Sequence, residues 1–583
     1  QVEEHIRTLF TQNKSIGRHA GGVIVADPAE LEQTMPMVGV RGELQTPWAE
    51  GLNFRNLEDN GFLKFDFLGL TLLRDVENCI RRILKRENGK EPTFDEIKAF
   101  FDKNLNCRFV KQDDLTVWKH VYEDGHFTGI FQFAQHGARN FAMEAKPQNI
   151  EDLAAVTAIY RPGPLKANVH KKYVKAKNDA MLKQPKYAHP VIEEVLGPTY
   201  GFIAFQEQFM LLAQKLAGFS PAEGDKLRKT LVKKSVEKLD AIYKERQDAR
   251  EKFIKGAKEV SNVSETIATN LWEEIDFFAQ YGFNKSHAVA YAIDSYYAAW
   301  LHTHYETDWL STILETEKGD PSRMAKAISE VKSYGYKFSP IDVNYSGDEW
   351  YYSKDLKAFV PPLSSLKGTG DKAVDEIMVH RPYRNLDELL FTPEGEWKHS
   401  KMNKASFASL CKMEAFGSLE EMKSGHIANH RQLFDLIIGQ YDTLRKGRYG
   451  ITDAAKRKME KKGETPPLIV DVLLSEILQD ASDWSRTDKI KNQFELSSNT
   501  SDELLYPLDL IQKLKQQDIP SALTLPEGKA IAWFCIMDGF EVKKTKNNKN
   551  FIKATVSDNE GNISKIKIWG DMDTSDFAYT IWI

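Results

Sequence analysis

The sequence predicts a multidomain α+β protein, and three features of the chain support this fold class. With 583 residues, the chain is several times longer than a domain with one core, which suggests about three to five compact units. Short apolar runs between Gly and Pro clusters predict strands in residues 1–75, whereas residues 76–345 have mostly helical apolar spacing. From Gly528 onward the apolar residues alternate as in strands, which is consistent with a small β-barrel.

Individual helices can be placed within this outline. Ile267, Leu271, Ile275 and Phe278 have helical spacing, and Tyr291 to Leu301 form an aromatic-rich helix whose rings we expect to pack in a core. The turn LKGTG, Leu366 to Gly370, leads directly into a helix from Lys372 to His380. Residues 426–525 are polar and rich in Lys, with few apolar periodicities, and are predicted to be a connector.

The composition narrows the class of protein. A hydrophobic content of 42% and a charged content of 28% are those of a soluble globular protein. No apolar run approaches the roughly 18 residues of a membrane helix and no leader peptide is recognisable, so we expect a cytoplasmic protein without a membrane partner. The four cysteines lie far apart and form no CxxC pair, so we expect neither disulfides nor a zinc site.

The charge distribution leaves two interpretations open. A net charge of −5 argues by itself against binding to nucleic acid. Lys and Arg are nevertheless concentrated between Lys226 and Lys258 and between Arg445 and Lys462. Each run is either a solvated helical face or part of a phosphate-binding surface, and the neighbouring motifs favour the second interpretation.

Asp66 is the residue whose negative charge most needs a compensating cation or metal. It lies between two Phe residues in the apolar run GFLKFDFLGL, Gly61 to Leu70, where a buried carboxylate is costly unless a cation or metal compensates its charge. Lys64 is two residues away, on the same face of a strand, and could meet the carboxylate or a bound phosphate. A structural ion pair with Lys64, or capping of the turn before Gly69, explains the pattern equally well.

Four further motifs offer groups that bind phosphate. GRHAGGVIVAD, Gly17 to Asp27, places a histidine before a Gly-Gly pair where the backbone can approach a ligand closely. A Pro-bracketed turn displays Arg161, a basic run follows Asp225, and a polar cluster at the start of a helix adds N–H groups and a dipole that favour an anion. Each motif alone is compatible with a cap, a core histidine or a solvated face. The candidate residues are Arg18, His19, Arg161, Arg228, Lys229, Lys233, Lys234, Asn284, Lys285 and His287.

The order of these motifs resembles that in bacterial-type family C replicative DNA polymerases, the DNA polymerase III alpha subunits. KFDFLGL, HAGGV, RPGPL, QEQ and YGFNKSHA are each close to the wording of that family, and the likeness extends over residues 14–345. Beyond residue 345, LKGTG resembles the family's helix-hairpin-helix, LCKMEAFGSL its companion helix, and residues 528–583 an incomplete OB fold. Val232, Ala134 and Gln135 depart from the family pattern, which suits a phage-encoded or otherwise divergent member.

The resemblance implies a role for each candidate residue. Asp66 matches the third of three palm aspartates that hold two Mg²⁺ ions, and Lys64, Arg18 and His19 would lie near the nucleotide or primer terminus. The other basic and polar candidates would contact nucleotide or template in the fingers. The helix-hairpin-helix would bind DNA through Lys367, Gly368, Gly370 and Lys372. The family's D-x-D pair of catalytic aspartates is absent from this sequence and is expected to precede residue 1.

The resemblance also implies the domain organisation. We expect a partial palm of the nucleotidyltransferase (pol beta-like) type, large helical fingers, a helix-hairpin-helix region and a partial OB-fold barrel. The expected segments are the end of the thumb (1–17), the carboxy-terminal part of the palm (18–75), the fingers (76–345), the helix-hairpin-helix or clamp-binding region (346–425), the Lys-rich connector (426–525) and the partial OB fold (526–583). RQLFDLI, Arg431 to Ile437, is either a clamp-binding peptide or an ordinary amphipathic helix.

The predicted activity is DNA-directed DNA polymerisation by two-metal catalysis, with deoxynucleoside triphosphates and primer-template DNA as substrates. A chain that starts at Gln1 and stops in a strand-like run is expected to be a fragment, inactive without an amino-terminal portion that carries the D-x-D pair. A sliding clamp is an expected partner. The alternatives are a DNA-binding or scaffold half of a split polymerase, and a non-catalytic relative, against which the presence of both Asp66 and Lys64 argues.

Overall fold

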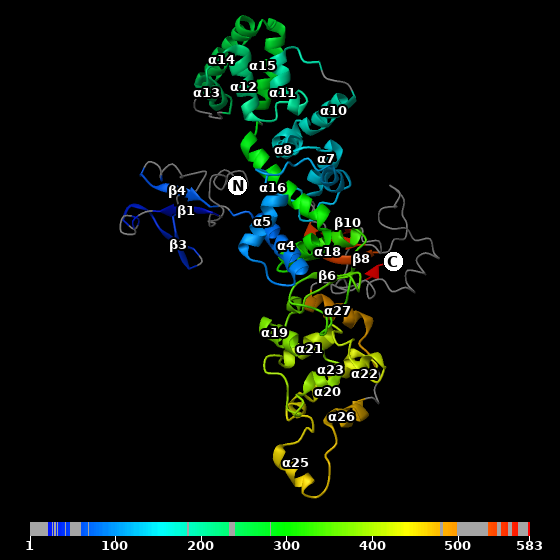
Figure 1. The fold of residues 1–583 in the computed structure, drawn as a ribbon. Helices are drawn as coiled ribbons and strands as arrows, with labels where there is room; N and C mark the ends of the chain where they lie inside the picture. Colours follow the sequence, from blue (N-terminus) through cyan, green and yellow to red (C-terminus); the bar gives the residue numbers. More distant parts are fainter. Residues whose placement is uncertain are drawn as a thin grey trace. The chain divides into compact units, whose positions relative to one another are not determined.

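The chain forms two compact units, Gln1–Arg74 and Asp75–Ile583, and each is described by itself. The computed structural model describes residues 21–25, 27, 31, 33–40, 42–46, 57, 60–67, 69–182, 186–232, 239–279, 282–477, 482–497, 535–544, 550–557, 563–569 and 581–582. Helices dominate the second unit and the sheets of both units are small, as an α+β chain predicts (Figure 1).

The described part of the first unit contains two antiparallel strand pairs. The strands are β1 (Gly22–Val25), β2 (Val38–Val40), β3 (Glu43–Gln45) and β4 (Leu63–Asp66), with β1 paired to β4 and β2 to β3. Gly22 lies opposite Asp66 and Ile24 opposite Lys64. β1 and β4 coincide with the two apolar runs from which strands were predicted. Strand alternation places Val23 and Phe65 on one face, and both are exposed.

The helical region begins with a long amphipathic helix whose first four residues, 71–74, belong to the first unit. Its helical elements are α4 (Thr71–Asn88), α5 (Phe94–Asn104), α6 (Leu115–Val117), the π-helix η1 (Trp118–Glu123), α7 (His136–Ala145), α8 (Ile150–Ile159), α9 (Pro162–Lys166), α10 (Val169–Leu182), α11 (Pro190–Leu196), η2 (Gly197–Thr199), α12 (Gln206–Ala217), α13 (Pro221–Val232), α14 (Leu239–Ser261), α15 (Glu265–Ala279), α16 (Lys285–His304), α17 (Glu306–Glu317) and α18 (Pro321–Ser333). Both predicted helices in this region, α15 and α16, are confirmed.

Two packing arrangements organise these helices. α11 to α15 enclose one apolar core, in which Phe209, Leu212 and Phe253 are fully buried. α12 and α14 approach closely because Gly256 has no side chain: a Cβ there would lie 2.1 Å from the carbonyl oxygen of Ala217. α16 packs against α8, and its Tyr296 and Tyr297 are buried, so these aromatic rings serve packing as expected.

A second core lies further along the chain. Its elements are the mixed sheet β5 (Lys337–Phe338), β6 (Tyr351–Ser353) and β7 (Ala358–Val360), followed by η3 (Leu363–Ser365), α19 (Asp371–His380), α20 (Leu386–Leu390), α21 (Lys404–Lys412), α22 (Glu420–Lys423), α23 (His430–Gly439), α24 (Tyr441–Leu444), α25 (Asp453–Glu460), α26 (Ile469–Ile477) and α27 (Arg486–Ser497). The apolar cluster runs from Ile341 to Leu474. The predicted boundary at residues 425/426 therefore does not coincide with a break in packing, because the few apolar residues of the Lys-rich segment join this core.

The last sheet is antiparallel and open. Its strands are β8 (Cys535–Lys544), β9 (Asn550–Ser557), β10 (Ile563–Trp569) and β11 (Ile581–Trp582), in the order β10-β9-β8-β11. Among these described strands β10 and β11 are the edges and do not pair, so they form no closed barrel. A β-bulge between Met537 and Gly539 shifts the register of β8 on β9.

We find no helix among the described residues whose length and hydropathy would let it cross a membrane.

Candidate functional site

The polar cluster at the start of α16 is held by capping. Asn284 is the N-cap residue, and its Oδ1 accepts a hydrogen bond from the N–H of His287 at 2.9 Å and from the hydroxyl of Ser286 at 2.6 Å. Asn is well suited to this position because its short side chain reaches the first unsatisfied N–H groups of a helix. The cap fixes the backbone at the start of α16, and with it the position from which the side chain of Lys285 extends.

A carboxylate from another helix reinforces this arrangement. Oε2 of Glu207, near the start of α12, accepts the N–H of Lys285 at 2.9 Å. Two N–H groups of the first turn of α16 thus already have acceptors within the protein. The anion-binding capacity predicted for this helix end therefore has to come mainly from side chains.

The segments that precede α12 and α16 lie side by side. Phe205 and Phe283 form an isolated parallel β-bridge, and the N–H of Gln206 donates to the carbonyl of Phe283 at 2.9 Å. The side chain of Gln206 also donates to the carbonyl of Gly282 at 3.0 Å. The two phenylalanines are consequently held as neighbours on two different segments.

A cationic side chain lies over each of these two phenylalanine rings. The guanidinium carbon of Arg161 lies 4.5 Å from the centroid of Phe283, and Nζ of Lys285 lies 5.8 Å from that of Phe205. Contacts of this kind contribute about 0.5–2 kcal/mol, depending on how far the cation is desolvated. The Phe205–Phe283 bridge thereby ties Arg161 and Lys285 to one site, which we call the two-cation site.

Arg161 is placed by the rigid turn that was predicted around it. It has an extended backbone immediately before Pro162, which opens α9 with the fixed φ that suits a first helical position. Its Nε donates to the carbonyl of Ala158 at 2.7 Å. Burial lowers the pKa of Arg161 from its usual value, but an arginine remains protonated at neutral pH.

Lys285 is partly exposed and has an exchangeable partner. Its Nζ lies 3.2 Å from Oε1 of Glu151 on α8, and the two side chains are 39% and 51% exposed. Ion pairs this exposed contribute about 1 kcal/mol or less. An anionic ligand could therefore replace Glu151 at little cost, and Arg161, over the neighbouring ring of Phe283, is the second cation of this site.

The other basic candidates lie elsewhere. Arg228 and Lys229, on α13, both pair with Asp225, at 2.8 Å each. Lys233, Lys234, Arg18 and His19 lie outside the described residues. His287 contacts the rings of Phe283 and Tyr291, with centroid separations of 5.3 and 4.0 Å.

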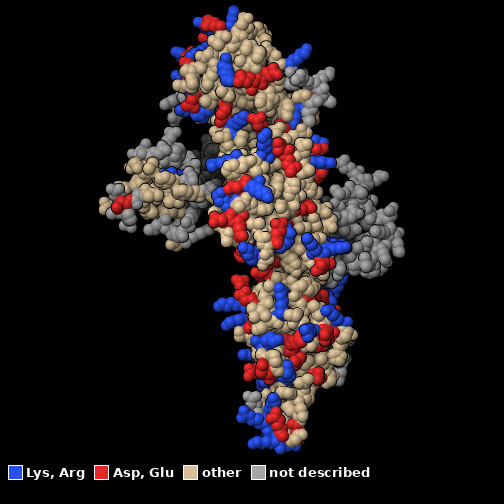
Figure 2. Space-filling view, in the orientation of Figure 1, with Lys and Arg blue, Asp and Glu red and all other residues tan. Residues whose placement is uncertain are grey.

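Several cations of the basic run from Lys226 to Lys258 are paired with carboxylates. Besides the pairs with Asp225, Lys252 pairs with Glu223 and Lys255 with Glu259. Figure 2 shows basic and acidic side chains interleaved over the visible face rather than one broad basic field. These pairs are compatible with a solvated helical face for part of this run, whose residues 233–238 lie outside the described residues.

Asp66 occupies the last position of β4, opposite Gly22. It is the only acidic residue in β1 and β4, whose sequences are GVIV and LKFD. Two magnesium ions in one active site require several carboxylate ligands. Asp66 is the one carboxylate that this described strand pair could offer to such ions.

The predicted helix-hairpin-helix turn is well anchored. Gly368 has φ +91°, which favours glycine, and a Cβ there would lie 2.6 Å from Oγ of Ser409. The hydroxyls of Ser406 and Ser409, on α21, donate to the carbonyls of Gly368 and Lys367 at 2.9 and 2.8 Å. Lys367, Gly368, Gly370 and Lys372 are all exposed.

The segment considered for clamp binding is part of the second core. It forms α23, in which Gln432, Leu433, Leu436 and Ile437 are buried. Oε1 of Gln432 accepts the N–H of Ala428 at 2.8 Å. The structure thus favours the amphipathic-helix interpretation, because the side chains that a clamp would need are covered.

Sequence reasoning missed the partners that shape the two-cation site. These are Glu151, Glu207, Phe205 and Phe283. Glu207 entered the sequence analysis only as the middle residue of the QEQ motif, and it is 78 residues from Lys285. No local spacing could have paired them, because the contacts depend on how α8, α12 and α16 pack.

Comparisons with known proteins concern most of the chain. Residues 82–261 match the family model described as the bacterial DNA polymerase III alpha subunit finger domain. The DNA polymerase III subunit alpha of Aquifex aeolicus (strain VF5) is 33% identical over 422 residues, which are 71% of this chain and 33% of that protein. Its counterpart in Chlamydia muridarum (strain MoPn / Nigg) is 28% identical over 585 residues, 98% of this chain and 43% of that protein. The counterpart in Thermus aquaticus is 30% identical over 490 residues, 82% of this chain and 36% of that protein. The chain spans well under half the length of these curated relatives.

Proposed function

We infer, from the finger-domain match of residues 82–261 and the similarity to bacterial DNA polymerase III alpha subunits, that this chain belongs to that family. We propose that it supplies the nucleotide-binding fingers and part of the DNA-binding surface of a DNA-directed DNA polymerase. In this proposal an incoming deoxynucleoside triphosphate and primer-template DNA are the ligands. The observation that carries the proposal is the two-cation site, since Arg161 and Lys285 are held by separate segments beside an exposed, replaceable carboxylate.

The two cations suit a triphosphate for electrostatic reasons. An arginine offers a planar fork of donors to phosphate oxygens, and a lysine contributes a mobile point charge. The phenylalanines beneath them restrict where the cations can go, so that less order has to be imposed when the ligand binds. Glu151 keeps Lys285 in place until a phosphate displaces it.

Asp66 is proposed as one ligand of the catalytic magnesium ions. Bound magnesium would stabilise negative charge on the reacting phosphate and the attacking hydroxyl. The remaining carboxylates would come from a D-x-D pair in an amino-terminal portion. Lys64, Arg18 and His19 are proposed to contact the nucleotide or primer terminus in the same palm, and Arg228, Lys229, Lys233 and Lys234 to contact template or nucleotide more remotely.

Steady-state primer extension tests the two-cation site. Arg161→Ala and Lys285→Ala are made in a polymerase that joins this chain to the amino-terminal portion, and the KM for the nucleotide is measured. Loss of a charge-assisted phosphate contact should raise that KM about 10- to 100-fold. The affinity for primer-template DNA, measured without nucleotide, should stay nearly constant.

Lys255→Ala is the matched control, because Lys255 is a 74% exposed lysine that pairs only along its own helix with Glu259. It should leave the KM unchanged. An unchanged KM in both Arg161→Ala and Lys285→Ala would refute the assignment of this site to the nucleotide.

A second candidate function is favoured by the anchored turn at Gly368: the chain could act as the DNA-binding or scaffold half of a split polymerase, inactive alone. Primer extension by this chain alone, and then with the upstream portion added, separates the two. Activity only after addition supports the split arrangement. A sliding clamp remains a proposed partner through a segment other than α23.

A further inference from the structure

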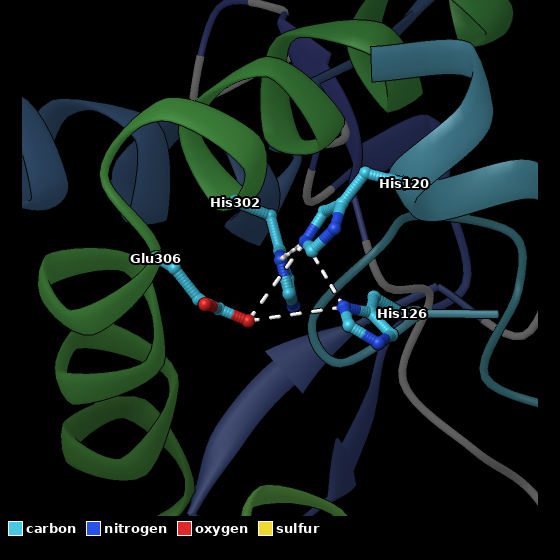
Figure 3. Close-up of side chains that lie close together, drawn as sticks. All are labelled: His120, His126, His302 and Glu306. Carbon is cyan, nitrogen blue, oxygen red and sulfur yellow. Dashed lines mark hydrogen bonds and ion pairs between the residues drawn. The ribbon is translucent and has the colours of Figure 1, made fainter. Parts of the chain in front are cut away.

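Three histidines and a glutamate from distant parts of the chain converge at one point of the second unit. Figure 3 shows His120, His126, His302 and Glu306 turned toward one another. His120 lies on η1, His126 on the loop that follows, His302 in the last turn of α16 and Glu306 at the start of α17. We call these four residues the histidine cluster. Neither the nucleotide site nor the helix-hairpin-helix turn uses them.

The ligand atoms of the histidine cluster are spaced as around a tetrahedral ion. Nε2 of His120 lies 3.0 Å from Nδ1 of His126 and 3.3 Å from Nδ1 of His302. Oε1 of Glu306 lies 3.8 Å from the first two of these nitrogens, and all four atoms lie within 4.8 Å of one another. With metal–ligand bonds of about 2.0–2.1 Å, a tetrahedral zinc ion separates its ligand atoms by roughly 3.4 Å.

Hydrogen bonds to the histidines do not explain the position of the Glu306 carboxylate. At 3.8 Å, Oε1 of Glu306 is too far from either ring nitrogen for a hydrogen bond. Its other oxygen, Oε2, accepts the hydroxyl of Tyr336 at 2.8 Å. This contact turns Oε1 toward the histidines, as outer hydrogen bonds do for metal-binding carboxylates.

His302 is the buried member of the histidine cluster. Its side chain is completely buried, and within the described part of the chain its Nε2 has no hydrogen-bond partner. If Nδ1 carries the proton, Nε2 is a buried acceptor without a donor. If Nε2 carries the proton, Nδ1 presents its lone pair to the centre of the cluster, which is the form that binds a metal.

One element of the histidine cluster is a rare type of helix, and further contacts hold the loop beside it. η1 is a π-helix, and single π-turns are frequent at functional sites because they redirect side chains. The ring of Tyr334 packs on that of His126, with centroids 4.5 Å apart, and its hydroxyl lies 2.9 Å from Oγ1 of Thr128. These contacts hold the loop that carries His126 against the two helices.

We propose that the histidine cluster is a binding site for one zinc ion, with Nε2 of His120, Nδ1 of His126, Nδ1 of His302 and Oε1 of Glu306 as ligands. Four protein ligands fill a tetrahedral shell, so the ion is structural and joins η1 and its loop to the junction of α16 and α17. The prediction against zinc considered only the cysteines and overlooked ligands that lie 182 residues apart in sequence.

Metal binding to the whole chain tests this proposal. The protein is freed of metal with a chelator and titrated with Zn²⁺ in competition with a chromophoric chelator, and separately with Co²⁺ as a spectroscopic probe. We expect one Zn²⁺ per chain with a Kd below roughly 1 µM, and an intense visible absorption from tetrahedral Co²⁺. We also expect a rise in the midpoint of thermal unfolding when Zn²⁺ is added.

Two variants and one control make the test specific. His126→Ala alters a loop residue that is 29% exposed, and Glu306→Gln preserves shape while removing the anionic ligand. Each should weaken Zn²⁺ binding at least tenfold and weaken the Co²⁺ band, with an unchanged far-UV circular dichroism spectrum. His136→Ala, an exposed histidine on α7, should bind Zn²⁺ as the unaltered chain does.

Two results would contradict the proposed zinc site. Absence of stoichiometric Zn²⁺ binding by the folded, unaltered chain would show that the cluster is only a hydrogen-bonded histidine network. Zn²⁺ binding that survives in both His126→Ala and Glu306→Gln would place the metal elsewhere. Either outcome overturns the proposal.

Discussion

Nζ of Lys177 lies 2.7 Å from Oδ2 of Asp152, and the two side chains are only 1% and 2% exposed. The pair joins α10 to α8, on which Glu151, the partner of Lys285, also lies. Nζ of Lys177 donates in addition to the carbonyl of Lys146 at 2.8 Å, and the hydroxyl of Tyr200 donates to Oδ1 of Asp152 at 3.0 Å. A buried charge with this many partners is tolerated only while all of them remain.

Lys177→Met should therefore destabilise the second unit by about 3–5 kcal/mol, because it leaves the carboxylate of Asp152 buried without its cation. Urea unfolding followed by tryptophan fluorescence measures the loss. Combining Lys177→Met with Asp152→Leu should cost less than the sum of the single changes, since neither charge then remains alone.

Lys146→Ala is the control for this pair. Its Nζ meets Glu123 at 2.6 Å, but the two side chains are 53% and 42% exposed, so the loss should be about 1 kcal/mol or less. A similar cost for Lys177→Met and Lys146→Ala would contradict the importance given to burial.

Glu376 makes the stability of the second core depend on pH. Its carboxylate accepts hydrogen bonds at 2.7–3.1 Å from the N–H groups of Ser400, Lys401 and Met402. Burial raises the pKa of Glu376, but these donors outweigh burial and lower the pKa to about 2. The stabilisation is thus fully present above the unfolded-state pKa of about 4.3, and is lost as the pH falls from there through the folded-state value.

Glu376→Gln should cost on the order of 3 kcal/mol at pH 7. Its free energy of unfolding should approach that of the unaltered chain as the pH falls toward 2, because the unaltered carboxyl is then protonated. Denaturation curves between pH 7 and pH 2 measure this convergence. Glu420→Gln, at an exposed position on α22, should shift stability by less than about 0.5 kcal/mol. A constant gap between the Glu376→Gln and unaltered curves would disprove the role of ionisation.

The sequence predicted those parts of the fold that local spacing determines. α15 follows from apolar periodicity, α16 from an aromatic-rich run, α19 from the turn that leads into it, and β1 and β4 from apolar runs between turn residues. Residues 426–525 were predicted to be a connector because polar residues outnumber the apolar ones there. The small number of apolar side chains, among them Leu433, Leu444 and Leu473, suffices once neighbouring helices supply the rest of the core.

The candidate site residues also fall into those with a local sequence signature and those without one. Asn284 and Lys285 could be found because a polar cluster at a helix start has a local signature. Their partners could not, since Glu151 is 134 residues from Lys285 and meets it only through the packing of α8 on α16. The histidine cluster was missed for the same reason.

Asp66→Asn should abolish nucleotide incorporation when this chain is joined to its amino-terminal portion. Removing one charged metal ligand costs several kcal/mol of transition-state stabilisation, or roughly a thousandfold or more in rate. Primer extension measures the rate, and fluorescence anisotropy of labelled primer-template measures DNA binding, which should change little. Asp27→Asn, an exposed aspartate just beyond β1, should retain activity. Substantial turnover by Asp66→Asn would eliminate Asp66 as a metal ligand.

The turn before α19 should bind the DNA backbone through Lys367 and Lys372, both of which are exposed. Lys367→Ala and Lys372→Ala should each weaken duplex binding, and each should reduce the slope of log affinity against log salt by about 0.9, because one phosphate contact is lost. Anisotropy titrations at several salt concentrations measure this slope. Lys423→Ala, on α22 in the same core, should leave it unchanged.

The two glycines of this turn separate folding from binding. Gly368→Ala should destabilise the turn, because its φ is +91° and the added Cβ would lie 2.6 Å from Oγ of Ser409. Gly370→Ala should fold normally, since Gly370 has φ −79° and nothing lies within 4 Å of the added Cβ. If a phosphate approaches the N–H groups at the start of α19 as closely as a glycine permits, Gly370→Ala will lose DNA affinity without losing stability. Unchanged affinity in Gly370→Ala would mean that the lysines alone hold the DNA and that the backbone of the turn stays clear of it.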